Sequence, residues 1–207
     1  MALKGSGSDV TSSFITAAAA DPDGISTAAS VSGAANLTIG GALASGGSVT
    51  MDSPRNVTIL SASDDSGITF TVTGTDESND AQTEVITGAD STTATGTKFF
   101  KTVTQIATSG SSAGNVSAGS GTSCCGVISV ARCRLRGIYV VNGSGAATIV
   151  FRESSGTGTI KMQFATVAGA STNSYPDVPD DGLLFVDGGF VTFTAVTDLT
   201  AMTTFFS

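Results

Sequence analysis

Apolar and small polar residues alternate along much of the chain, as in strands that bury one face. In the stretch "ITFTVT", Ile68, Phe70 and Val72 fall on one side and threonines on the other. Threonine suits the second side because it is β-branched and also tolerates water. The flanking segments "DDSG" and "DESND" have the composition of turns, and we interpret their acidic residues as turn formers rather than catalytic carboxylates. The pattern predicts a meander with one apolar face and one face of threonines.

Similar segments recur on both sides of a Gly/Ser-rich stretch at 107–123. The expected strands before it are residues 36–43, 48–51, 55–60, 67–75, 83–88 and 98–106, and those after it are 127–141, 147–153, 159–167, 182–189, 190–196 and 202–207. No segment combines helical periodicity with a cap and a suitable length. We therefore predict an all-β protein with two small β-sandwich or barrel-like domains, residues 25–120 and 121–207, joined by a Gly/Ser-rich linker.

The first 24 residues differ from the rest, because they are rich in Ala, Ser and Gly and contain a single apolar patch, "FITAAAA". The following "DPDG" has the composition of a turn. We expect residues 1–24 to form an extended N-terminal arm. Phe14 and Ile15 would be its apolar anchors.

Composition and charge narrow the range of partners. The chain has 207 residues, of which 26 are glycine, none is tryptophan and 13% are charged, so its surface is expected to consist mainly of hydroxyl and methyl groups. Its formal net charge of −8 disfavours nucleic acid as a partner, since binding there depends on neutralising phosphates. No segment resembles a signal peptide or a membrane span, which predicts synthesis in a cytoplasm and no membrane partner.

The residue types that carry most enzyme chemistry are scarce. Without histidine there is no Ser-His-Asp or Cys-His pair, and no Gly-rich segment has the spacing of a phosphate-binding loop. The three cysteines, Cys124, Cys125 and Cys133, are too few for a metal site and are interpreted as buried strand residues. We predict a protein that is not an enzyme and has no cofactor or metal.

One cluster is a candidate contact site. Arg132, Arg134 and Arg136 recur at a period of two, so on a strand they share one face while the residues between them point to the other. This arginine row is interpreted either as a solvated face paired with cross-strand acids or as a surface that docks an acidic partner. DNA binding is a weaker alternative for an acidic chain.

Two long segments resemble known proteins. The first is "SGGSVTMDSPRNVTILSASDDSGITFTVTGTDESNDAQTEVITG", followed by "TKFFKTVTQI" and "AGNVSAG", within residues 36–119. It resembles a module of tailed-bacteriophage structural proteins. The segment "RLRGIYVVNGSGAATIVFRESSGTG", continuing to "FFS", is similar to a module of short-tailed phages of marine and cyanobacterial hosts. Such proteins have no catalytic residues to carry over.

The resemblance implies a structural protein of the virion, assembled in the host cytoplasm. We expect a capsid decoration (cement) protein, a homotrimer that binds the major capsid protein and stabilises the head lattice. Its N-terminal arm would then lie on a neighbouring subunit, anchored by Phe14 and Ile15. The alternatives are a tail, neck or fibre-associated protein, or a carbohydrate-binding adhesin domain for which Tyr139 and Tyr175 are the available tyrosines.

Overall fold

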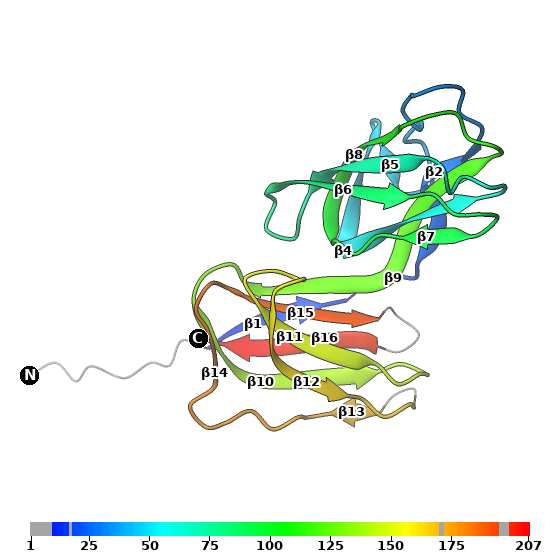
Figure 1. The fold of residues 1–207 in the computed structure, drawn as a ribbon. Coiled ribbons are helices and arrows are strands. Elements are labelled where there is room, and N and C mark those ends of the chain that lie inside the picture. The colour runs from blue at the N-terminus through cyan, green and yellow to red at the C-terminus, as the bar shows by residue number, and fades with distance from the viewer. Residues whose placement is uncertain (1–9, 17, 170–171, 195–198) are drawn as a thin grey trace, which may run out of the picture.

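The computed structural model describes residues 10–16, 18–169, 172–194 and 199–207, and within these ranges the chain is all-β. Its strands form two sheets, neither of which closes into a barrel. Figure 1 shows two bodies one above the other, the first half of the chain forming the upper one and most of the second half the lower one. The predicted all-β fold class is confirmed. Residues 1–9 of the expected arm, and the end of the strand expected at 190–196, lie outside the described residues.

The first sandwich is built from eight strands, the last of which it shares with the second sandwich. They are β2 (Asp21–Ala29), β3 (Ala44–Ser45), β4 (Ser48–Ser61), β5 (Thr69–Thr75), β6 (Ala81–Thr87), β7 (Thr93–Thr95), β8 (Phe100–Thr108) and β9 (Val116–Ser129). The turns expected around β5 are present, and Phe70 and Val72 are fully buried as the alternation predicts.

Strand β4 changes partners along its length, which brings two layers together. Its first part pairs with β8 from Val49 to Arg55, and its second part pairs with β9 and β7. The apolar core lies between the layers and includes side chains of both parts of β4, such as Met51 and Ile59. The register shift between Thr50 and Arg55 marks the bend.

The second sandwich has seven further strands of the second half of the chain and one from the N-terminal region. They are β10 (Cys133–Asn142), β11 (Thr148–Glu153), β12 (Thr159–Ala165), β13 (Asn173–Ser174), β14 (Leu183–Phe185), β15 (Gly189–Thr194), β16 (Leu199–Phe206) and β1 (Thr11–Ile15). One layer has the order β1-β16-β10-β13, with β14 also on β10, and we call it the outer sheet. The opposite layer has the order β12-β11-β15-β9. Phe151, Phe185 and Leu199 are among the fully buried side chains between them.

The expected Gly/Ser-rich linker is mostly a strand, which corrects the predicted boundary between the domains. β9 runs without interruption from Val116 to Ser129, pairing with β2 and β4 in the first sandwich and with β15 in the second. Glycine is needed here for close packing. A Cβ atom on Gly119 would lie 2.1 Å from the Asp21 carbonyl oxygen, and one on Gly121 would lie 2.4 Å from Asn56 Oδ1.

The N-terminal region also differs from the expected arm. Residues 11–15 form β1, an edge strand that pairs with β16 of the same chain, and β2 starts at Asp21, inside the expected "DPDG" turn. The chain thus passes from the second sandwich to the first in the short connection between β1 and β2. Strand pairing with the chain's own sheet satisfies backbone groups that a free arm would leave to solvent.

Apolar contacts join the two sandwiches. Phe99, which precedes β8, packs with Cys125 of β9 and Phe190 of β15. Beside them the backbone N–H of Gly156 donates to the buried Glu77 carboxylate across the two sandwiches. The shared strand β9 and these contacts form a continuous interface between the two sandwiches, which we call the joint.

Candidate attachment surface

The arginine row lies at one end of β10, on the outer sheet. Arg134 and Arg136 point away from the core, while Cys133 and Leu135 between and beside them are buried. Arg132 is exposed but belongs to the bend that precedes β10. The face predicted from the period of two therefore holds for two of the three arginines.

Arg134 and Arg136 converge on a single acceptor. Nη1 of Arg134 and Nη1 of Arg136 donate to the same backbone carbonyl oxygen, that of Asp181, at 2.9 and 3.0 Å. Arg136 Nε also donates to Ser207 Oγ at 3.0 Å. Gly182 allows the Asp181 carbonyl to approach β10, because its φ is +73° and a Cβ atom there would lie 2.7 Å from the Leu135 carbonyl oxygen.

Neither guanidinium group forms an ion pair with a carboxylate within the part of the chain that the structure describes. The ion pairs found there are Arg55–Asp52 and Lys161–Glu153. Cross-strand acids, one interpretation of the row, are therefore not what holds Arg134 and Arg136. Their remaining N–H groups are left to water or to a partner.

The two expected apolar anchors have opposite surroundings. Ile15 is buried in the core of the second sandwich and lies opposite Met202 of β16. It cannot serve as an anchor on a neighbouring subunit without leaving this core, so that prediction is wrong for Ile15. Phe14 is 70% exposed and lies opposite Thr203. Adjacent residues of a strand point to opposite faces, which separates the two side chains.

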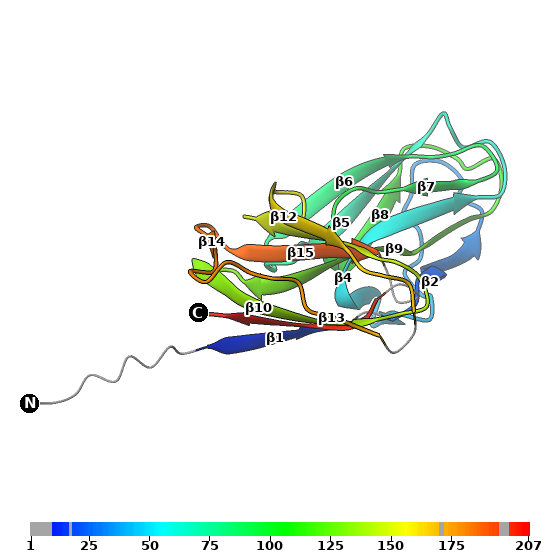
Figure 2. The same ribbon diagram turned by 90° about the horizontal axis from the view of Figure 1, so that it is seen from below.

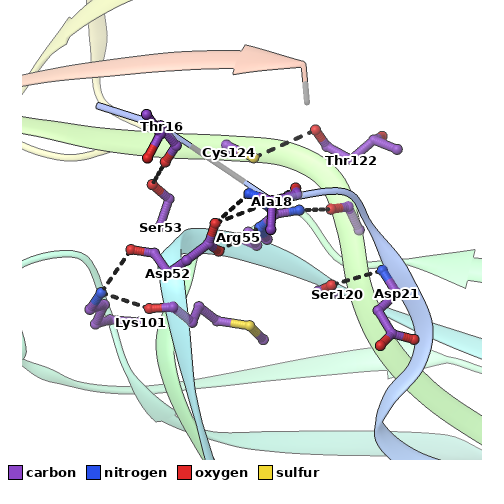
Figure 3. A network of polar contacts seen from close by, with 12 residues as sticks. Thr16, Ala18, Asp21, Asp52, Ser53, Arg55, Lys101, Ser120, Thr122 and Cys124 are labelled. Carbon is purple, nitrogen blue, oxygen red and sulfur yellow. Dashed lines mark hydrogen bonds and ion pairs between the residues drawn. The ribbon is translucent and has the colours of Figure 1, made fainter. Parts of the chain in front are cut away.

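A polar network that the sequence did not reveal lies at the joint (Figure 3). Arg55 of β4 is only 1% exposed, and its Nε donates to Asp52 Oδ1 at 3.2 Å. Its terminal nitrogens donate to the backbone carbonyls of Ala18, in the β1–β2 connection, and Gly121, in β9. The sequence gives one signal of this network, which is an arginine within an otherwise alternating strand. The burial of Arg55, however, depends on segments that are far apart in the sequence.

Further donors hold Asp52 in this network. Burial alone would raise the pKa of its carboxyl, but hydrogen bonds from the backbone N–H groups of Ala18 and Ser53 and the charge of Arg55 outweigh burial, so the pKa is lowered. Lys101 Nζ donates to the backbone carbonyls of Met51 and Asp52 at 2.7 and 3.2 Å. These contacts make the site a structural node that joins β4, β9 and the β1–β2 connection.

The acidic turn residues have structural roles. Asp64 Oδ1 accepts from Ser66 N and Oγ, and Asp76 Oδ1 accepts from the backbone N–H groups of Ser78 and Asp80, as in Asx turns. Asp65 and Glu77 of these turns are buried. Asp65 accepts from Ala113 N at 2.7 Å, and burial raises the pKa of Glu77.

The cysteines are free and buried, in agreement with their interpretation as strand residues. Cys124 faces the core of the second sandwich, whereas Cys125 faces the joint. Burial raises the pKa of Cys124 to about 11 and that of Cys125 well above its ordinary value.

Among the described residues no three His, Cys, Asp or Glu side chains are grouped as metal ligands. None of the described segments is a helix long and apolar enough to cross a membrane.

Comparisons of the chain with known proteins identify no relative. No protein-family model matches the chain, and neither a curated protein nor a solved structure is significantly similar to it. Function must therefore be argued from the residues and their geometry.

Proposed function

We propose that this chain is a non-enzymatic structural protein of a bacteriophage virion, and specifically a decoration protein that binds the major capsid protein on the outside of the head. The observation that carries the proposal is the convergence of Arg134 and Arg136 on one carbonyl oxygen without an ion pair. Two like charges held together are unfavourable in the free protein, and an acidic partner would relieve their repulsion.

The partner is a protein surface rather than nucleic acid. A chain of net charge −8 repels a polyanion at long range, and one small basic cluster is a weak footprint for phosphate binding. A protein partner can place a few carboxylates at the arginines and bury apolar area beside them.

The two sandwiches suit a part that bridges neighbouring subunits of a shell. They share β9 and are joined by apolar contacts and by the Arg55 node, so the chain presents two bodies in a defined relation. In this proposal the protein assembles in the host cytoplasm as a homotrimer and requires no cofactor.

The copy number in the particle tests the proposal. Quantitative mass spectrometry of purified virions should find hundreds of copies, and sedimentation of the free protein should give the mass of a trimer. A count of about six or twelve, as expected for ring-shaped tail and neck assemblies, would reject decoration in favour of a tail, neck or fibre-associated protein.

A carbohydrate-binding role is the second candidate, and one observation favours it. The Tyr139 and Tyr175 rings lie 5.0 Å apart at 49°, and Tyr175 is 67% exposed, so the pair could stack on a sugar. Retention on a glycan array that is lost in Tyr175→Ala would support this role, and absence of retention by the wild type would reject it.

A further inference from the structure

The exposed aromatic side chains of the protein gather on one face. All aromatic residues of the sequence fall in the described ranges, and the exposed ones are Phe14 of β1, Phe205 of β16 and Tyr175, which follows β13. The three strands belong to the outer sheet. Tyr139 of β10 joins them through its contact with Tyr175. We call these four residues the aromatic face.

The strand register makes this face contiguous. Phe14 and Tyr139 lie opposite Thr203 from its two sides, and Phe205 lies opposite Gly137. Phe205 is therefore diagonal to both Phe14 and Tyr139, a relationship that places side chains about 7–8 Å apart. A Cβ atom on Gly137 would lie 3.6 Å from the Phe205 ring, which shows that the ring covers the glycine.

The face is turned to solvent. Phe14 is 70% and Phe205 39% exposed, although every other phenylalanine is buried or partly buried. In Figure 2 the outer sheet is the lower layer, and its free side points away from the other strands of the molecule. Clustered exposed aromatic residues indicate an interaction site.

The arginines lie on the same side of the outer sheet. The side chains of Arg134, Arg136 and Tyr139 all point outward from β10, and Arg134 is two residues before Arg136 on that strand. An apolar aromatic centre with arginine at its edge is the typical composition of a protein interface, where aromatic and arginine side chains contribute most of the binding energy.

We infer that the aromatic face with Arg134 and Arg136 is the docking surface of the protein, and that its occupant is an acidic, partly apolar protein surface. This inference rests on the proposed function and names the side of the molecule that meets the lattice. Charge complementarity selects the occupant, because the two guanidinium groups have no ion pair and match carboxylates in bidentate geometry. A second copy is less suitable, since pairing this face with itself would bring the cations of both copies into one interface.

Binding to particles that lack this protein tests the inference. Three variants are compared with the wild type: Phe14→Thr with Phe205→Thr, Arg134→Gln with Arg136→Gln, and Arg134→Lys with Arg136→Lys. Val85→Thr is the control for the apolar changes, because Val85 is exposed on β6 of the other sandwich. Lys98→Gln is the control for lost charge, since Lys98 is also exposed in the first sandwich.

The phenylalanine variant should bind at least tenfold more weakly, and the glutamine variant about tenfold more weakly at low salt. The lysine variant should lie between the glutamine variant and the wild type, because it keeps the charge but not the bidentate geometry. Wild-type affinity should fall with added salt more steeply than that of the glutamine variant. The two control variants should bind like the wild type.

The remaining outcomes each overturn the inference, and they can be told apart. If the wild type binds and all three variants bind equally well, the docking surface lies elsewhere and the inference is wrong, although the proposed function stands. If the wild type does not bind the particles, the proposed function fails and the inference with it. Oligomers of the free protein that Phe14→Thr with Phe205→Thr dissociates would identify a second copy as the occupant, and glycan binding lost in Tyr175→Ala would identify a sugar; either result overturns the inference.

Discussion

Arg55 Nε lies 3.2 Å from Asp52 Oδ1, and this pair ties together three segments that are distant in the sequence. Both residues belong to β4, while the other acceptors of Arg55 are carbonyls of the β1–β2 connection and of β9. The node therefore lies where the chain passes between the sandwiches by two separate routes. An ion pair with only one buried partner is weak evidence for added stability, but here it specifies how the segments meet.

Replacing the arginine tests the node. Arg55→Met keeps most of the apolar stem but removes the donors to Ala18 and Gly121, so we expect a loss of about 2–4 kcal/mol in the free energy of unfolding. Urea denaturation measures it. The control Lys98→Met removes an exposed cation and should change stability by less than about 0.5 kcal/mol. Equal effects in the two variants would contradict the structural role of the node.

Asp52→Asn should give a pH-dependent loss. Because the pKa of Asp52 is lowered in the folded protein, its ionised form adds stability above the ordinary aspartate pKa, and this contribution disappears as pH falls through the lowered value. The side chain is 42% exposed, so solvent screening limits the effect to about 1 kcal/mol at pH 7. Urea titrations at a series of pH values should show the wild type and the variant converging in acid. A difference that stays constant with pH would show that charge is not the cause.

Glu77→Gln should raise the stability of the protein at pH 7, whereas Asp52→Asn should lower it. Burial raises the pKa of Glu77, so the folded protein favours the protonated form, and this contribution to stability is lost as pH rises from the ordinary glutamate pKa through the raised value. Glutamine keeps an oxygen that can accept from Gly156 without a charge to desolvate. We expect the variant to be more stable than the wild type at pH 7 and no more stable in acid, as measured by thermal melting. Glu77→Ala, which removes the acceptor, should be less stable at both pH values.

The cysteine thiols should resist alkylation in the folded protein. Burial limits access, and it raises the pKa of Cys124 to about 11, so little thiolate forms at pH 8. Iodoacetamide followed by mass spectrometry should label the cysteines slowly in buffer and rapidly in concentrated urea. Fast labelling of any of the three in buffer would contradict the burial seen here.

Gly119→Ala tests the packing of β9 between the sandwiches. The new Cβ atom would meet the backbone of β2 at 2.1 Å, and backbone cannot move aside as a side chain can. We expect a loss of about 2–4 kcal/mol in the free energy of unfolding. The control is Gly67→Ala, because a Cβ atom there has no neighbour within 4 Å and its stability should change little or rise slightly. Equal stability of both variants would indicate that this stretch is the flexible linker suggested by its composition.

The sequence alone determined the features that depend on local alternation. The period of two predicted the presence of the strands. It also predicted that Phe70 and Val72 are buried and that Arg134 and Arg136 point outward. These could be predicted because the pleat places successive side chains on opposite faces whatever the partner strand is. The all-β class follows from the same regularity.

Only the tertiary structure decided which strands pair and which faces meet. Part of the expected arm is the edge strand β1 on β16, part of the expected linker is the first half of β9, and Arg55 is buried at a joint between distant segments. Glycine and serine are equally compatible with a flexible linker and with a strand packed too closely for a Cβ atom, so composition could not separate the two. The aromatic face has the same origin, because Phe14, Phe205 and Tyr139 become neighbours through the register of three strands that the sequence keeps far apart.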